Sequence, residues 1–189
     1  MTPGTRHDLR MAPSSRTWIG FLRAINLGAK RKFPKDDIRA AVEAAGFTDV
    51  ETYLNTGNVR FATTLRSRAR IEAALEEAFL ADRGFEVPTI VFTPQELTEI
   101  AEHAASLGHG GRHYVSLLKQ APTAAQVAAV EAAGTAGEVA RVAGRAVHLL
   151  LGANYHEARL TNAAVERRLG VATNRNLSVI QALADKWCR

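Results

Sequence analysis

Leu22-Arg23-Ala24-Ile25-Asn26-Leu27-Gly28-Ala29-Lys30-Arg31-Lys32 is the stretch that decides the fold of this chain, together with Tyr53-Leu54-Asn55-Thr56-Gly57-Asn58-Val59-Arg60-Phe61. In each stretch a β-rich run breaks into a polar loop that contains glycine. The first loop carries cations at positions 30, 31, 32 and 35 after Arg23, and no acid before Asp36, so it alone matches the net charge of +5. This loop is therefore the best candidate for a functional surface.

The elements predicted around these loops follow the order βαββαβ. In chain order they are a strand over 17–25, a helix from Pro34 to Gly46, strands over 47–54 and 59–63 flanking Asn55-Thr56-Gly57-Asn58, a helix over 67–81 and a strand over 85–92. The first strand carries apolar residues on both faces, which is typical of a strand covered on both sides. This order indicates a ferredoxin-like α+β unit, with an antiparallel sheet and helices packed on one face.

The pattern repeats after a glycine-rich segment. A short helix capped by Thr93 leads into residues 106–112, which we interpret as a linker. The heptapeptide Ala-Ala-Val-Glu-Ala-Ala-Gly occurs at 40–46 and again at 128–134, and the same spacing aligns two hairpins. The sequence thus predicts two ferredoxin-like units in tandem, over 17–105 and 113–189. The second unit is expected to end in a C-terminal helix where a fourth strand would complete the repeat.

Composition restricts the class of protein. The chain has 189 residues, 47% of them hydrophobic, and no apolar run approaches the roughly 18 residues that span a bilayer, so no membrane partner is expected. Residues 1–16 mix proline, serine and charge and are expected to form a disordered tail, in which Met11 is a second candidate start of translation. The single cysteine, Cys188, can form no internal disulfide, which indicates a cytoplasmic location.

The predicted topology brings the two loops together. Strands one and two of a βαββαβ sheet run in the same direction with strand three between them, so the strand-one loop and the hairpin turn share one end of the sheet. Asn26 and Asn58 are therefore expected to be neighbours. Amides beside Lys30 and Lys32 are typical of a phosphate or carboxylate site. In the alternative interpretation the asparagines hydrogen-bond their own turns and the lysines face solvent.

Three strings resemble the signatures of a bacterial family, number 1697 in the domain-of-unknown-function series. They are Leu22-Arg23-Ala24-Ile25-Asn26-Leu27-Gly28, Thr52-Tyr53-Leu54-Asn55-Thr56-Gly57-Asn58-Val59 and Thr173-Asn174-Arg175-Asn176. The family pattern is close to LRGINVGG and lysine, TYxxSGNVVF and TxRNW, so that Ala24 and Ala29 stand for glycines, Thr56 for serine and Leu177 for tryptophan. The resemblance runs from about residue 17 to the end of the chain. It implies an α+β fold of two ferredoxin-like halves and no established activity.

We hypothesise that a small anionic or phosphorylated ligand binds at the strand-one loop and the hairpin turn. The candidate ligand-binding residues are Arg23, Asn26, Lys30, Lys32, Gly57, Asn58, Arg175 and Asn176. A ligand site predicts a concave pocket that joins the two loops. The alternative is a nucleic-acid or protein interaction module, which would present the basic loop on a convex face. A structural role for Arg175, holding the C-terminal helix between the two halves, is the alternative at that position.

Other signals indicate no further chemistry. Gly28-Ala29-Lys30 lacks the preceding glycine and the following hydroxyl residue of a phosphate-binding P-loop. His103, His109 and His113 do not share one helical face, so no metal site is predicted. No side chain in the two loops can be assigned as a catalytic base, and no cofactor signature follows them. The sequence therefore predicts a site without predicting a reaction.

Overall fold

The computed structural model describes residues 14–152 and 155–189 and consists of two α+β units. Residues 1–13 of the predicted tail lie outside the described residues. The first unit contains β1 (Arg16–Leu22), the short 3-10 turn η1 (Ala29–Arg31), α1 (Lys35–Ala44), β2 (Thr48–Tyr53), β3 (Asn58–Thr63), α2 (Arg68–Arg83) and β4 (Thr89–Phe92). Its strands are antiparallel, in the order β2-β3-β1-β4, which is the ferredoxin-like order.

The second unit repeats this arrangement. After α3 (Pro94–Ser106) come β5 (Arg112–Leu118), α4 (Ala124–Glu131), β6 (Glu138–Ala143), β7 (Ala146–Leu151), the 3-10 turn η2 (Tyr155–Glu157), α5 (Asn162–Leu169), β8 (Ala172–Asn176) and α6 (Leu177–Trp187). Its strand order, β6-β7-β5-β8, has the same form as in the first unit. The chain is therefore a tandem pair of ferredoxin-like units.

β8 corrects the expectation that the second unit lacks a fourth strand. It pairs antiparallel with β5, from Leu118 opposite Ala172 to Tyr114 opposite Asn176. The run Thr173-Asn174-Arg175-Asn176 is polar and has a weak strand signature, because asparagine is depleted in strands. The side chains of Thr173 and Arg175 reach across to the first unit, where polar partners take the place of an apolar core. Tertiary contact thus overrides local propensity.

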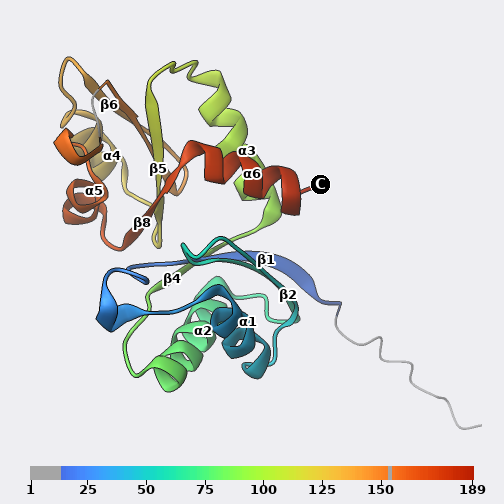
Figure 1. Ribbon diagram of the computed structural model, residues 1–189. Coiled ribbons are helices and arrows are strands. Elements are labelled where there is room, and N and C mark those ends of the chain that lie inside the picture. Colours follow the sequence, from blue (N-terminus) through green and yellow to red (C-terminus); the bar gives the residue numbers. More distant parts are fainter. Residues whose placement is uncertain (1–13, 153–154) are drawn as a thin grey trace, which may run out of the picture.

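Each sheet is covered on both faces. Helices α1 and α2 pack on one face of the first sheet, and α4 and α5 pack on one face of the second (Figure 1). The two remaining faces share a core with α3 and α6, in which Ile19 and Phe21 of β1 meet Val115 and Leu117 of β5. The two-faced apolar pattern of β1 follows from this arrangement, since Trp18 points into the other core.

The two units meet through equivalent contacts with their roles exchanged. The residue after β1, Arg23, binds the carboxylate of Glu166 on α5, and the residue after β5, Lys119, binds Glu76 on α2. Each carboxylate also accepts the first backbone N–H of the last strand in its own unit, at 3.2 Å from Ala172 N to Glu166 and 2.8 Å from Thr89 N to Glu76. This matching supports an internal duplication in which the two halves pack about an approximate two-fold axis.

Two histidines are buried inside the second unit. Nε2 of His113 lies 3.0 Å from Nδ1 of His148, and the two side chains are 5% and 0% exposed. Within the described residues, their other ring nitrogens have no hydrogen-bond partner. Burial, with a smaller effect from neighbouring histidines, lowers the pKa of His113 to about 4 and that of His148 to about 3. Both rings are therefore neutral near pH 7.

This pair predicts a loss of stability in mild acid. The unfolded chain takes up protons on both histidines below about pH 6.5, while the folded chain resists until about pH 4. The free energy of unfolding should thus fall between pH 6.5 and 4, by up to about 1.4 kcal/mol per pH unit for each histidine. Urea denaturation at pH 7, 6 and 5 measures the slope, which His148→Phe should reduce. An unchanged dependence of the unfolding free energy on pH in that variant would contradict its attribution to the buried histidine pair.

Candidate functional site

The strand-one loop, residues 23–34, is held by the side chain of Asn26. Its Nδ2 donates to the carbonyl oxygens of Asn55, at 2.6 Å, and Phe33, at 3.0 Å, and its Oδ1 accepts the N–H of Phe33 at 2.8 Å. Ala24 and Asn26 both have a left-handed backbone, with φ of 55°. The loop therefore reaches the β2–β3 hairpin as predicted from the topology, and it does so through Asn55.

The hairpin fits against the end of β1 because residue 57 is glycine. Gly57 has φ of 78°, and a Cβ at this position would lie 2.8 Å from the Cβ of Leu22. The following residue, Asn58, begins β3 and is 1% exposed. Its Nδ2 donates to Tyr53 O and Thr56 Oγ1, both at 2.9 Å. Gly57 and Asn58 therefore stabilise the hairpin turn from its buried side.

Arg175 of β8 enters this hairpin from the second unit. Its Nε donates to Asn58 Oδ1 at 2.7 Å, and Nη2 donates to the carbonyl oxygens of Leu22, Thr56 and Gly57 at 3.1, 2.8 and 3.2 Å. Nη1 donates to Thr173 Oγ1 at 2.9 Å and to the Asn174 carbonyl oxygen at 2.8 Å. The guanidinium group is therefore saturated with hydrogen bonds.

The positive charge of Arg175 is buried without a counter-ion among the described residues. Its side chain lies over the ring of Phe21, at 5.6 Å, and the residue is only 7% exposed. Burial lowers the pKa of Arg175 to about 10, and no carboxylate of the described residues contributes to that shift. The surrounding carbonyl dipoles stabilise the cation, but its net charge is not cancelled.

A cleft of about 670 Å³ opens beside Arg175, between the two units. We call it the signature cleft, since it joins parts of all three signature strings. It is lined by Leu22, Arg23, Ala24, Ile25, Asn26, Leu27, Asn55, Thr56, Asn162, Thr173, Asn174 and Arg175. A concave pocket thus lies where the two loops meet.

The candidate residues from the sequence divide into four groups. Arg23, Asn26 and Arg175 line the signature cleft, whereas Lys30 and Lys32 are exposed and do not line it. Gly57 and Asn58 are buried behind the hairpin turn. Asn176 caps α6, its Oδ1 accepting the N–H of Ser178 at 3.0 Å. The structure therefore places three of the candidates in the cleft wall, two behind the hairpin turn and one at the start of α6. The two lysines lie on the surface outside the cleft.

Arg23 forms one wall of the cleft and is partly neutralised. Its Nε and Nη2 donate to the two carboxylate oxygens of Glu166 at 2.6 and 2.9 Å, and the hydrogen bond with Glu166 raises the pKa of Arg23. The side chain is 35% exposed. The paired charges cancel in part, while the exposed part of the guanidinium group faces solvent.

Asn174 and Thr173 were not among the candidate residues, although both belong to the third signature string. Asn174 alternates with its neighbours along β8 and lines the cleft. Within the described residues, its Oδ1 is buried and has no hydrogen-bond partner. Such a group is costly unless a ligand or water satisfies it. Asn162 and Glu166, on α5, had no sequence signal, because neither belongs to a motif.

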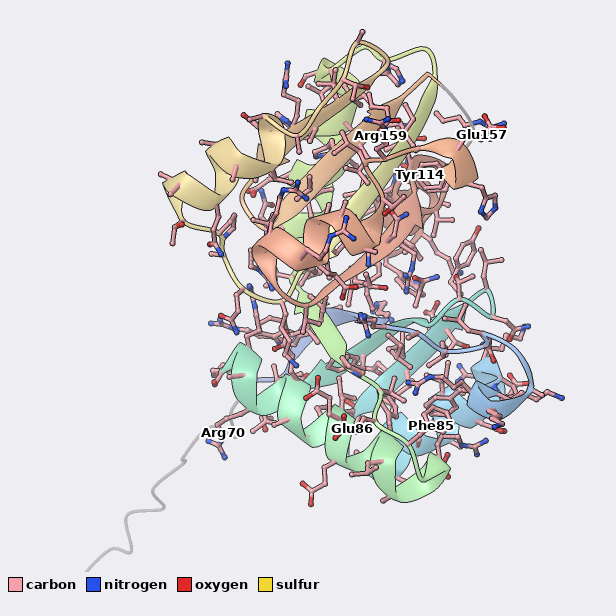
Figure 2. The ribbon with its side chains drawn as sticks, turned by 90° about the vertical axis from the view of Figure 1, so that its left-hand side faces the viewer. Arg70, Phe85, Glu86, Tyr114, Glu157 and Arg159 are labelled. Atoms are coloured by element: carbon pink, nitrogen blue, oxygen red, sulfur yellow. The ribbon has the colours of Figure 1, made fainter. Side chains whose placement is uncertain are left out.

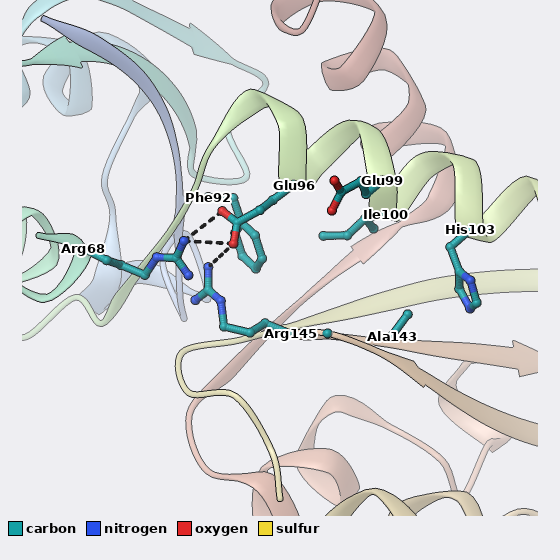
Figure 3. A pocket seen from close by; sticks show the side chains of 9 residues that line it. Arg68, Phe92, Glu96, Glu99, Ile100, His103, Ala143 and Arg145 are labelled. Atoms are coloured by element: carbon teal, nitrogen blue, oxygen red, sulfur yellow. Dashed lines mark hydrogen bonds and ion pairs between the residues drawn. The ribbon is translucent and has the colours of Figure 1, made fainter. Parts of the chain in front are cut away.

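A second cleft, of about 420 Å³, is lined by the equivalent hairpin, last strand and helix start with the units exchanged, and by α3 in place of a loop after the first strand (Figure 3). Arg145 of the β6–β7 hairpin lies 4.0 Å from the ring of Phe92 on β4 and donates to the Val91 carbonyl oxygen at 2.7 Å. Here a carboxylate is present, since Glu96 lies 3.8 Å from Arg145 and accepts from Arg68 at 2.9 Å. The buried arginine of the second cleft is thus matched by an anion, whereas Arg175 is not.

The histidines do not form a metal centre in this structure. Among residues 14–152 and 155–189, no group of three or more His, Cys, Asp or Glu side chains is placed to hold a metal ion. No helix in the described part of the chain has both the length and the apolar character needed to cross a bilayer.

Comparisons with known proteins agree with the fold. A family model described as "Protein of unknown function (DUF1697)" matches residues 16–148, which include the first two signature strings and end before the third. The conserved bacterial protein SP0830 from Streptococcus pneumoniae has a similar structure, with a TM-score of 0.75 at 20% identity, covering 93% of this chain and 100% of that chain. No curated protein matches the chain.

The contacts of Arg175 predict a large loss of stability for Arg175→Lys. An ammonium group cannot reproduce the planar fork, so several carbonyl groups lose their donor while a buried charge remains. We expect a loss of about 2–4 kcal/mol in the free energy of unfolding, measured by urea denaturation. The matched control is Arg60→Lys, because Arg60 forms a partly exposed ion pair with Glu51 and should change stability by less than about 1 kcal/mol. Equal losses in the two variants would contradict this role.

The backbone of Ala24 predicts that Ala24→Gly stabilises the protein. A left-handed conformation costs alanine roughly 1–2 kcal/mol, which exceeds the entropy that glycine adds to the unfolded chain. We expect a net gain of about 0.5–1 kcal/mol by urea denaturation. Ala29→Gly is the control, since Ala29 also stands for a glycine of the family pattern but is not among the positive-φ residues. A gain at position 29, or none at position 24, would refute this explanation.

Proposed function

Because this chain belongs to the DUF1697 family, whose function is unknown, we propose a function from the site itself: the protein binds a small ligand carrying a phosphate or carboxylate group in the signature cleft. The observation that carries this proposal is the unmatched positive charge of Arg175 beside an open cleft. A desolvated cation raises the electrostatic potential of a cleft with low-dielectric walls, and this potential attracts anions.

Arg175 supplies charge, and its neighbours supply contacts. Every N–H of Arg175 already has an acceptor, so a ligand would gain from its field rather than from direct hydrogen bonds. Arg23 and Asn174 line the same cleft, where the exposed part of the Arg23 guanidinium group and the side-chain N–H groups of Asn174 can donate to anionic oxygens. The unpartnered Oδ1 of Asn174 can only accept, so it suits a ligand hydroxyl or a water. The ligand group therefore belongs between these two residues.

The duplication provides an internal comparison. In the second cleft, Glu96 already lies against Arg145 and Arg68, so an anion entering there would meet a carboxylate. No carboxylate is among the described residues that line the signature cleft, and Glu166, which Arg23 engages at both oxygens, lies outside that lining. This difference favours the signature cleft as the anion site.

The alternative, a nucleic-acid interaction module, requires exposed cations, and Arg31 of the basic loop is bound within the protein. Arg31 turns inward, where Nε donates to Ala24 O at 2.5 Å and Nη2 to Glu86 O at 2.7 Å, with the guanidinium group over the ring of Phe85. Figure 2 labels Phe85 and Glu86, which lie between α2 and β4. Lys30 and Lys32 remain exposed. We therefore favour the small ligand over nucleic acid.

We also propose a cytoplasmic location, because the single cysteine of the chain can form no internal disulfide.

The first test uses Asn174, which makes no side-chain hydrogen bond that would be lost. Isothermal titration with inorganic phosphate, phosphate monoesters and short carboxylates measures affinity for the wild-type protein and for Asn174→Ala. We expect about tenfold weaker binding in the variant, the value of one hydrogen bond to a charged group, with an almost unchanged free energy of unfolding. No binding to the wild-type protein, or equal affinity in the variant, would refute the proposal.

The second arm compares two equivalent ion pairs. Arg23→Met and Lys119→Met each remove the cation that follows the first strand of a unit and leave a carboxylate behind. Both variants should lose a similar amount of stability. Only Arg23→Met should weaken anion binding, because Lys119 does not line the signature cleft. Equally weakened anion binding in the two variants would contradict a specific role of Arg23 and would show a general loss of docking between the units.

A further inference from the structure

Leu27 is the most exposed large hydrophobic side chain among the described residues. It is 67% exposed and lies in the strand-one loop, where it lines the signature cleft together with Arg23 and Arg175. A single exposed leucine is common and needs no explanation by itself. Its position in a cleft that also contains Arg23 and Arg175, and the way its loop is held, distinguish this one.

The loop that carries Leu27 is anchored on both sides of it. Asn26 binds the backbone of Phe33 through both atoms of its amide, and its own N–H donates to Arg31 O at 2.7 Å. Arg31 then binds the carbonyl oxygens of Ala24 and Glu86. These contacts fix the backbone around position 27, so Leu27 is presented to solvent by an ordered loop instead of a loose one.

The loop has no counterpart in the second unit. Residues 23–34 connect β1 to α1, whereas residues 119–123 alone connect β5 to α4. The equivalent contacts between the units do not need the additional residues, since Lys119 reaches Glu76 from the short connection. The longer loop therefore adds something beyond the docking of the units, and what it adds to the cleft is the apolar surface of Leu27.

From these observations we infer that the ligand of the signature cleft is amphiphilic: an anionic head lies near Arg23 and Arg175, and an apolar body packs on Leu27. The ligand class is a phosphate monoester or carboxylate with an aliphatic or aromatic substituent. This inference rests on the proposed anion-binding function and specifies its ligand. Ala24 and the edge of Ile25, which also line the cleft, extend the apolar wall toward the head group.

The test is a chain-length series. Isothermal titration of the full chain with inorganic phosphate, then methyl, propyl, butyl and hexyl phosphate, measures the gain in affinity per methylene. Burial of a methylene contributes about 0.8 kcal/mol, so affinity should rise by up to about fourfold for each one added. Leu27→Ala should flatten this series while leaving the affinity for inorganic phosphate unchanged.

Leu54→Ala is the matched control. Leu54 is 47% exposed in the adjacent hairpin but does not line the cleft, so this variant should retain the wild-type series. If phosphate binds but affinity does not depend on chain length, or if Leu27→Ala keeps the dependence, the amphiphilic ligand is refuted and anion binding stands. If neither phosphate nor any monoester binds, the proposed function itself fails.

Discussion

The buried guanidinium group of Arg175 is the constraint on which the contact between the units depends. One side chain from β8 supplies donors to the end of β1, to the β2–β3 hairpin and to Asn58. Removing a charged group from water costs several kcal/mol unless its hydrogen bonds are replaced, so these acceptors must stay in place. Gly57 allows the hairpin to approach Leu22 closely enough for the carbonyl oxygens of both segments to share this donor group.

In this duplicated fold the two units contact each other at two clefts, and each cleft contains a buried arginine whose charge is treated differently. At the signature cleft the buried arginine is Arg175, from the last strand of the second unit. At the second cleft it is Arg145, from the β6–β7 hairpin. Glu96 compensates Arg145, and no described carboxylate compensates Arg175. Two clefts of common architecture therefore differ in electrostatic potential. The binding site that we propose is a product of this difference, and the long strand-one loop adds an apolar wall to the same cleft.

Much of the fold could be predicted from local patterns. Alternation in β1, the hairpin around Gly57 and the repeated heptapeptide were sufficient for two tandem ferredoxin-like units, because periodicity and turn chemistry act over short distances. β8 was missed because its polar residues are stabilised by the other unit. Asn26 was correctly placed beside the hairpin, while its amide proved to hold the loop. Asn58 faces Arg175 in the interior, which no spacing rule could indicate.

The sequence by itself determined the elements other than β8, their order and the signature residues, since these follow from propensity, glycine positions and the pattern of apolar residues. Only the tertiary structure decided which side chains share the cleft. Arg23, Leu27 and Asn174 lie far apart in the chain and meet because the two units dock. Whether a charge is matched depends on the same docking, because the nearest carboxylate in space has no fixed place in the sequence. For Arg175 that docking provides carbonyl oxygens and, among the described residues, no carboxylate, and this is the physical reason for the anion site that we propose.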